Sequence, residues 1–290
     1  MYYQISNEFL TVSAETLGAQ LASIKNPEGT EYLWQGDPTF WRNRASILFP
    51  HVGRLTEGKY TFGGKTYEMP IHGFAKGMEF IGEQVSETEM WFHLESSPET
   101  REMYPFEFRF SVGYRLEGNA LIQSYRVENC GDETMFYGLG GHPGFNVPME
   151  EGLVFEDYQL EFAPDANITQ VGLSATCFPN GEDVPYAPEN NIVPLRHSCF
   201  DNDAIVLIEP GRRVKMGSPK GKRSVTAEYP DCTYLGLWHK PHSEAPYVCI
   251  EPWHSLPARQ DVIEDLATQP SLLSLPAHET YLTAMIFSFT

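Results

Sequence analysis

The sequence predicts an all-β protein, a large antiparallel β-sandwich with few short helices. Short apolar stretches with a period-two alternation recur along the 290 residues, which is typical of strands with one buried face. The chain also contains 24 glycines and 22 prolines, which leave little room for long helices. Because no fixed-period repeat or low-complexity linker divides the chain, we expect residues 1–290 to form a single sandwich domain.

The individual elements follow from local patterns. Residues 60–62 and 65–67 flank Gly63-Gly64, a dipeptide that favours a tight hairpin turn. The segment 164–194 is rich in Pro, Asn and Gly, so we expect a long surface loop there. One short helix is expected over 260–267, with its acidic residues on the exposed face. Further strands are expected at 91–94, 106–112, 121–127, 204–208, 234–238, 247–250 and 280–289.

The charge and the cysteines exclude several classes of function. Asp and Glu outnumber Lys and Arg by 39 to 20, which gives a formal net charge of −19. Such a surface repels phosphate backbones, so we expect no nucleic-acid partner. The five cysteines are scattered without a C-x-x-C pair, which argues against a disulfide framework or a structural zinc site. No apolar stretch is long enough to cross a membrane, and we expect a cytoplasmic protein.

Four short segments combine ionisable residues with rigid surroundings: 50–54, 72–76, 140–146 and 249–254. In the third, Gly140 and Gly141 allow unusual backbone angles and Pro143 fixes the backbone where the chain leaves the segment. A histidine held in this way, His142, suits a general acid or a metal ligand. An exposed turn histidine is an equally good interpretation of this segment alone.

Glu251 follows the apolar strand 247–250 and precedes Pro252-Trp253. A carboxylate at the end of a buried strand and beside an indole is partly desolvated, which raises its pKa and strengthens it as a base. An ordinary surface glutamate at a strand end is the alternative interpretation.

A metal site with two histidines and carboxylates is conceivable from His72, His142, Asp203 and Glu251. These residues have no H-x-H or H-E-x-x-H spacing, and the sequence 239–242 has a lysine and a proline between its two histidines. Neither a phosphate-binding G-x-x-x-x-G-K-[ST] loop nor a G-x-S-x-G elbow occurs. We therefore expect no metal and no cofactor.

In their order and separation, the four segments resemble the aldose 1-epimerase (galactose mutarotase-like) family over nearly the whole chain. The segments are Pro-His-Val-Gly-Arg, His-Gly-Phe-Ala-Lys, Gly-Gly-His-Pro-Gly-Phe-Asn and Cys-Ile-Glu-Pro-Trp-His. The last three are similar to the LacX-like subgroup, and His-Gly-Phe-Ala is also similar to the hexose-6-phosphate epimerases. The resemblance implies the mutarotase-like supersandwich fold and an isomerase that interconverts the α and β anomers of an aldohexose or related sugar.

The resemblance also implies the catalytic roles. It assigns the base to Glu251 and the acid to His142, and His72 assists at the sugar ring. Ring opening needs an ionised Glu251 and a protonated His142 at the start of the cycle, and a neighbouring carboxylate would help to keep the histidine charged.

The residues that bind the sugar follow in the same way. Arg54 matches the family's substrate-binding arginine. An aspartate is expected to bind sugar hydroxyls, and Asp203, which directly precedes the strand, is preferred over Asp201. Trp238 and Trp253 offer an apolar platform for the sugar, although core packing is the simpler interpretation of either alone.

Two alternatives remain open. Lys76, with Arg42 or Arg44, could bind a phosphate, which would indicate a hexose-6-phosphate 1-epimerase. A non-catalytic carbohydrate-binding or regulatory protein on the same fold is the second alternative. In each case the partner is a small sugar, and a monomer and a weak homodimer are equally compatible with the sequence.

Overall fold

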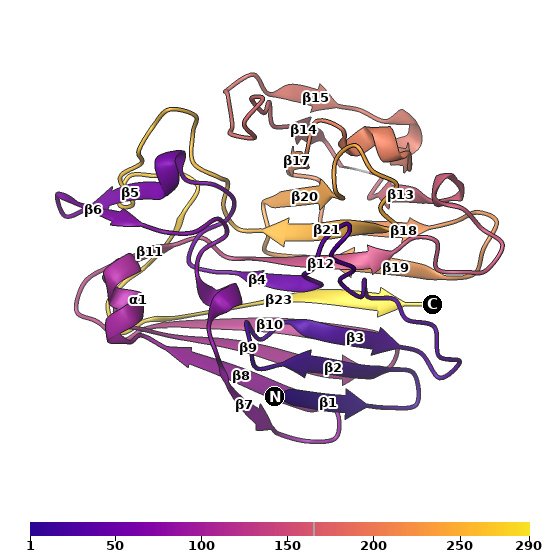
Figure 1. Ribbon diagram of the computed structural model, residues 1–290, viewed down its shortest axis with the longest axis horizontal. Helices are drawn as coiled ribbons and strands as arrows, with labels where there is room; N and C mark the ends of the chain where they lie inside the picture. Colours follow the sequence, from indigo (N-terminus) through magenta and orange to yellow (C-terminus); the bar gives the residue numbers. More distant parts are fainter. Residues whose placement is uncertain (165) are drawn as a thin grey trace.

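The structure, a computed structural model, describes residues 1–164 and 166–290. Its strands form two large sheets and three small ones, and every pairing between named strands in this part of the chain is antiparallel (Figure 1). The larger sheet has nine strands within the described residues. In spatial order they are β16 (Ile192–Pro194), β13 (Gln159–Phe162), β18 (Arg213–Gly217), β19 (Ser224–Glu228), β23 (Thr280–Phe289), β10 (Ala120–Asn129), β9 (Phe108–Glu117), β8 (Glu89–Glu95) and β7 (Ile81–Gln84).

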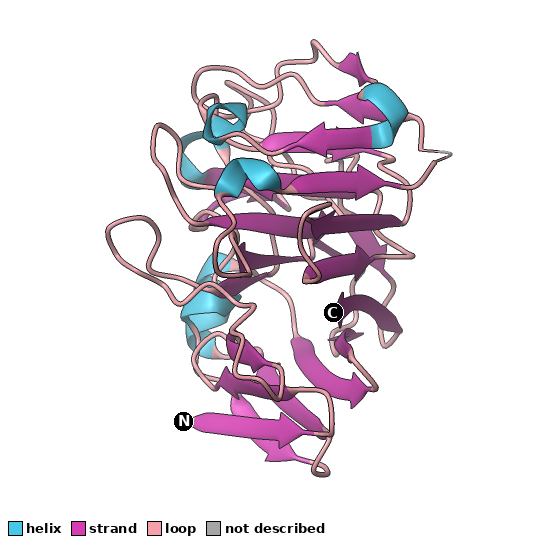
Figure 2. Cartoon of the chain, turned by 90° about the vertical axis from the view of Figure 1, so that its right-hand side faces the viewer, coloured by secondary structure: helices cyan, strands magenta, loops and turns pink. Residues whose placement is uncertain are grey.

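The second large sheet carries the short motif segments. In the described residues it has seven strands, ordered β15 (Val184–Tyr186), β14 (Ile168–Gln170), β17 (Ile205–Ile208), β20 (Tyr234–Trp238), β21 (Tyr247–Trp253), β12 (Gly140–Asn146) and β4 (Ala45–Leu48). Figure 2 shows the side of the molecule at which these strands are stacked above the N-terminal ones.

Short elements complete the fold. The small sheets are β1 (Tyr2–Ser6), β2 (Thr11–Glu15) and β3 (Leu21–Lys25); β5 (Lys59–Phe62) and β6 (Lys65–Glu68); and β11 (Met135–Tyr137) with β22 (Leu273–Leu275). The only α-helix in the described ranges is α1 (Pro98–Met103), whose Ser97 caps it by accepting a hydrogen bond from the Thr100 N–H. Single 3₁₀ turns lie at Thr56–Gly58, Ala75–Gly77, Phe155–Asp157, Glu189–Asn191 and His197–Phe200. None of the described helices has the length and apolar character needed to cross a bilayer.

Side-chain alternation places one face of each large sheet in a shared core. On β21, Val248 and Ile250 point into this core, and on β12 so does Phe145, which contacts Phe287 of the nine-stranded sheet. Phe110 lies fully buried between the sheets and stacks on Phe49 with ring centroids 4.3 Å apart. The alternate residues of β21 therefore face away from the core.

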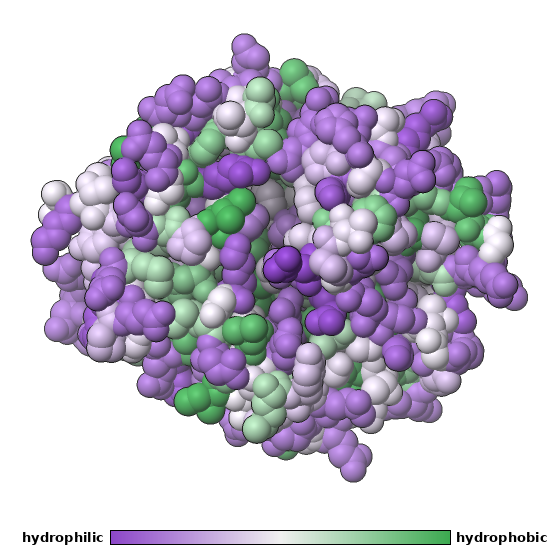
Figure 3. All heavy atoms as spheres, viewed as in Figure 1, coloured by the Kyte–Doolittle hydropathy of each residue, from purple (hydrophilic) through white to green (hydrophobic). Residues whose placement is uncertain are grey.

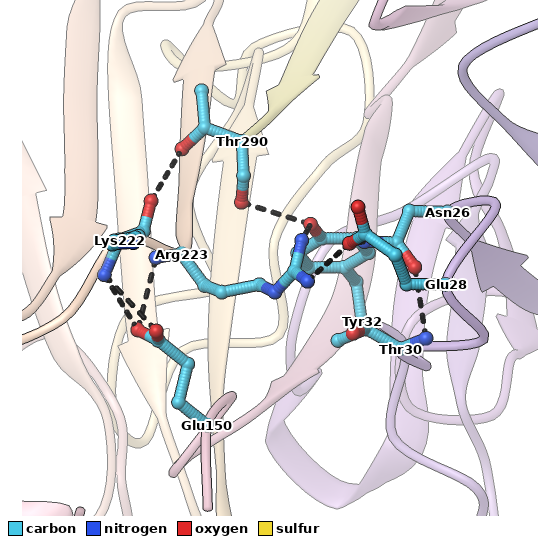
Figure 4. A network of polar contacts seen from close by, with 8 residues as sticks. All are labelled: Asn26, Glu28, Thr30, Tyr32, Glu150, Lys222, Arg223 and Thr290. Carbon is cyan, nitrogen blue, oxygen red and sulfur yellow. Dashed lines mark hydrogen bonds and ion pairs between the residues drawn. The ribbon is translucent and has the colours of Figure 1, made fainter.

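The C-terminal strand is tied to a loop near the N-terminus (Figure 4). The Tyr32 hydroxyl donates to the carbonyl of Thr290 at 2.8 Å, and Arg223 donates to both Tyr32 and Glu28. The carboxylate of Glu150 accepts hydrogen bonds from the N–H groups of residues 222 and 223. Because β23 also lies between β10 and β19, distant parts of the chain meet along this one strand.

Most of the expected strands are present, including the hairpin around Gly63-Gly64, and three expectations need correction. No helix forms over 260–267; the N–H of Leu266 instead donates to the carbonyl of Thr61, and Arg259 pairs with Glu264. These tertiary contacts use groups that a helix would need.

The segment 164–194 is more than a surface loop, because β14, β15 and β16 extend the edges of both sheets; Asp165 lies outside the described residues. The strand expected over 106–112 begins at Phe108 and continues to Glu117.

The aromatic core predicts the effect of a truncation. Phe110→Ala removes a ring that is packed from both sheets, so the free energy of unfolding in urea should fall by about 3–5 kcal/mol. Leu282→Ala is the matched control, since Leu282 on β23 is 65% exposed and its truncation should change stability by about 0.5 kcal/mol or less. Equal effects of the two substitutions would contradict the core described here.

Candidate active site

A cavity of about 350 Å³ opens on the face of the seven-stranded sheet that points away from the core. Figure 3 shows hydrophobic residues scattered among hydrophilic ones on the side viewed there. Eight of the residues that the sequence singled out line this cavity: Arg54, His72, Lys76, His142, Asp203, Trp238, Glu251 and Trp253. Its lining is Trp41, Asn43, Ser46, Gly53, Arg54, Ile71, His72, Lys76, His142, Leu173, Cys177, Asp203, Ala204, Val206, Trp238, Glu251, Trp253 and Pro257.

His142 and Glu251 meet across two neighbouring strands. The register between β12 and β21 pairs Gly140 with Trp253 and Gly144 with Cys249, which puts His142 opposite Glu251. Nε2 of His142 lies 3.4 Å from Oε2 of Glu251, and both residues are buried. The sequence had suggested that Glu251 follows a strand ending at residue 250. It lies inside β21 instead, because the strand continues through Pro252 to Trp253.

Gly140 and Gly141, which precede His142, allow neighbouring side chains to pack close to the backbone; they do not adopt unusual backbone angles. Residues 140–146 form strand β12, and neither Gly140 nor Gly141 has a positive φ. A Cβ at Gly140 would lie 2.7 Å from the Trp253 ring, and one at Gly141 would lie 2.9 Å from the Tyr125 hydroxyl. The expectation of unusual backbone angles at these two glycines is therefore wrong, and so is the interpretation of His142 as an exposed turn residue.

Three aromatic rings fix the orientation of the His142 imidazole. Trp41 stacks on it with centroids 4.7 Å apart, while His72 and Trp238 approach it edge-on. His72 is held in turn by the N–H of Gly53, which donates to its Nδ1 at 3.1 Å. In the neutral His72 ring the proton therefore lies on Nε2, which is a hydrogen-bond donor.

Asp203 is anchored at the edge of the cavity by two partners. The indole N–H of Trp238 donates to its Oδ1 at 2.7 Å, and Arg54 lies 3.6 Å from its Oδ2. Asp201 does not line the cavity and pairs instead with His242. Of the two aspartates left open by the sequence, the structure thus brings Asp203 to the other candidate residues.

Lys76 is the second cation of the cavity wall. Its Nζ donates to the carbonyl of Ile71 at 2.6 Å, and burial lowers the pKa of its ammonium group. Neither Arg42 nor Arg44 is among the described residues that line the cavity, and Arg44 lies 3.9 Å from Glu15. The arginines considered as phosphate ligands therefore do not join Lys76.

Burial disfavours charge on both members of the central pair. It raises the pKa of Glu251 well above its usual range, and the nearby Asp203 carboxylate raises it further. Burial also lowers the pKa of His142 to about 3, and the positive charge of Lys76 acts in the same direction. Desolvation thus favours the neutral form of each group in the free protein, and the ionised Glu251 and protonated His142 expected at the start of the cycle stay a prediction.

Several buried polar atoms at the cavity have no hydrogen-bond partner among the described residues. They are Nδ1 of His142, Oε2 of Glu251 and Nε1 of Trp253. Buried polar atoms are usually paired, so these atoms are suited to hydrogen bonds with a polar ligand. The group suited to a metal ion is His142, Cys249 and Glu251, whose ligand atoms all lie within 4.8 Å of one another; His72 and Asp203 do not belong to it.

Sequence reasoning missed Trp41, which stacks on His142, and Ser46, which pairs with His142 across β4 and β12. The signal for Trp41 was present as Phe40-Trp41 in a stretch without strand alternation, where two aromatic residues have no obvious core to fill. Ser46 gave no signal, because a serine in an apolar strand is common.

The pKa of His142 can be checked by histidine-selective NMR. Because burial penalises the charged imidazolium, the ring should stay neutral between about pH 5 and 8, a range in which ordinary histidines titrate with a pKa of about 6.5. His142→Gln identifies the signal. A midpoint near that ordinary value would contradict the desolvation described here.

A family model described as aldose 1-epimerase matches residues 1–263. Protein LacX (plasmid) of Lactococcus lactis subsp. lactis is 34% identical over 267 residues, which cover 88% of this chain and 88% of LacX. The X-ray structure of a galactose mutarotase related enzyme from Lactobacillus acidophilus has a TM-score of 0.95 and 32% identity, covering 100% of this chain and 97% of that chain.

A galactose mutarotase-like protein from Lactobacillus casei ATCC 334 has a TM-score of 0.94 and 31% identity, with 100% of both chains covered. These findings confirm the resemblance indicated by the motifs and the mutarotase-like β-sandwich. The chain belongs to the aldose 1-epimerase family.

Proposed function

We propose that this protein is an aldose 1-epimerase that interconverts the α and β anomers of a free aldohexose or a related sugar by acid–base ring opening. The observation that carries the proposal is the contact between His142 and Glu251, 3.4 Å apart in the wall of a cavity of about 350 Å³. An acid and a base that touch the same small cavity are what the reaction requires.

Ring opening moves two protons. The Glu251 carboxylate takes the proton of the anomeric hydroxyl, the His142 imidazolium donates a proton to the ring oxygen, and the C1–O5 bond breaks to give the open-chain aldehyde. Rotation about C1–C2 and the reverse proton transfers close the ring on the other face. The pair ends ring opening as a neutral carboxyl and a neutral imidazole, and ring closure restores the charged form.

The buried pair suits this cycle because its total charge is zero in both forms. Transfer of a proton from Glu251 to His142 converts the neutral form, which burial favours, into the carboxylate–imidazolium form that opens the ring. Oε2 and Nε2 lie 3.4 Å apart, so they have to approach to hydrogen-bond distance for a direct transfer. The site therefore never buries a net charge during turnover, which is the expensive alternative. Since ring opening already proceeds in water, positioning and acid–base catalysis are sufficient, and we propose no cofactor.

The surrounding residues would bind and orient the sugar. Asp203, held by Arg54 and Trp238, presents a carboxylate that accepts hydrogen bonds from hydroxyl groups. The Nε2–H of His72 can donate to an oxygen of the ring. The indoles of Trp238 and Trp253 offer apolar faces to the C–H groups of a pyranose.

The first test is polarimetry on freshly dissolved α-D-glucose and α-D-galactose, with the protein and with Glu251→Gln. The substitution should lower the rate of anomer exchange by about 10²–10⁴-fold, while the folded structure survives because glutamine resembles the neutral carboxyl that burial favours. Asp201→Asn, outside the cavity, is the control and should retain the rate. A fully active or an unfolded Glu251→Gln protein would refute the assignment. Sugar binding without faster exchange in the wild type would favour a binding protein.

A hexose-6-phosphate is the second candidate substrate, because the Lys76 ammonium group lines the cavity. Comparing glucose with glucose 6-phosphate decides between them. We expect the neutral sugar to have the higher kcat/KM, since Arg42 and Arg44 lie outside the cavity lining. If the phosphate is preferred and Lys76→Met removes that preference, the phosphorylated substrate is the correct one.

A further inference from the structure

Cys249 lies beside the His142–Glu251 pair but belongs to a different environment. It is two residues before Glu251 on β21, so both side chains leave the same face of the sheet. Cys249 is fully buried among aromatic residues and is not part of the cavity lining. Its Sγ nevertheless lies within 4.8 Å of a ligand atom of His142 and of Glu251.

The spacing of these atoms is close to that of a metal site. A tetrahedral zinc ion, bound at its usual distances to nitrogen, oxygen and sulfur, separates its ligand atoms by roughly 3.3–3.8 Å. The His142–Glu251 contact of 3.4 Å already falls in this range. The remaining separations are at most 4.8 Å, so binding requires the Cys249 thiol to approach the other two ligands by rotation about its Cα–Cβ bond. Because His142 and Glu251 line the cavity, a fourth ligand can reach the ion from there.

The charges of such a complex also balance. Binding releases one proton from the Cys249 thiol and one from the Glu251 carboxyl to solvent, and the thiolate and carboxylate then neutralise the two positive charges of the ion. His142 binds as a neutral imidazole through a nitrogen lone pair. A buried site with zero net charge avoids the penalty that opposes isolated buried ions.

We propose that His142, Cys249 and Glu251 form an inhibitory binding site for a thiophilic divalent cation such as Zn²⁺. A sulfur, a nitrogen and a carboxylate oxygen select zinc, cobalt or cadmium over magnesium, which prefers oxygen ligands. An ion bound here occupies the nitrogen and the oxygen that exchange protons with the sugar, so it stops the reaction. The inhibition rests on the proposed epimerase function; the binding itself does not.

The test begins with binding. Purified protein is titrated with Co²⁺, whose tetrahedral thiolate complexes have an intense charge-transfer band and visible d–d bands. Wild type should bind one Co²⁺ with both features, Zn²⁺ should displace it, and Mg²⁺ should not. Cys249→Ala should lose the charge-transfer band, and Cys249→Ser serves the same purpose if the alanine variant does not fold. Cys232→Ser is the matched control, a buried cysteine that contacts His254 at 3.5 Å, and it should bind like wild type.

Activity is measured second, on the same proteins. Zn²⁺ should inhibit wild type and Cys232→Ser, while Cys249→Ala should keep its basal rate and need at least about tenfold more Zn²⁺ for half-inhibition. Absence of the charge-transfer band in wild type, or its persistence in Cys249→Ala, would overturn the proposed site. Binding with no anomer exchange by the metal-free protein would instead overturn the epimerase function and leave the metal site standing.

Discussion

Glu251 lies in the middle of β21, a strand with neighbours on both sides and burial on both faces, and the cost of a charge at this position constrains everything around it. An isolated carboxylate at this position would carry a large desolvation cost. Burial therefore raises the pKa of Glu251 and lowers that of His142, so the two groups in contact both favour their neutral forms. The permanent charges are kept at the edge of the cavity, where Arg54 and Asp203 partly offset each other and reach solvent. The charge-neutral pair at the centre is thus the arrangement that this fold can bury.

Rigidity of the site follows from its place on a sheet. The side chains of one face of β12, β20 and β21 fill the core and those of the other face line the cavity, so the same strands hold both. Gly236 has a part in this, because a Cβ there would lie 2.6 Å from the Trp253 ring, and its absence lets the indole lie against the sheet beside Glu251. Sites built on regular elements keep their geometry better than sites on loops.

The sequence predicted the strands with strong alternation, because a period-two pattern is visible in one dimension. The set of residues that meet in the cavity came from the resemblance of four short segments to the aldose 1-epimerase family. Sequence reasoning failed where tertiary contacts decide the outcome. No helix forms over 260–267 because the N–H of Leu266 pairs with the carbonyl of Thr61. Gly140 and Gly141 suggested unusual backbone angles, but they lie in an extended strand in which neighbouring rings leave no room for a Cβ. The desolvation of His142 could not be predicted either, because the depth of burial is a property of the whole fold and not of any local segment. Trp41 was missed because its partner is a hundred residues away.

The position of β23 at the centre of the nine-stranded sheet sets the order in which that sheet can be completed. Strands β7–β10 are continuous along the chain up to Asn129, but the outer edge of β10 pairs with β23, which begins at Thr280. On the other side of β23 lies β19, from a separate half of the sheet. While the ribosome synthesises the roughly 150 residues between β10 and β23, the edge of β10 is unpaired and the apolar face of its sheet is only partly covered. Unpaired edges of this kind can pair with strands of other chains. The nine-stranded sheet is therefore completed only by a long-range pairing, and topologies rich in such pairings tend to fold slowly.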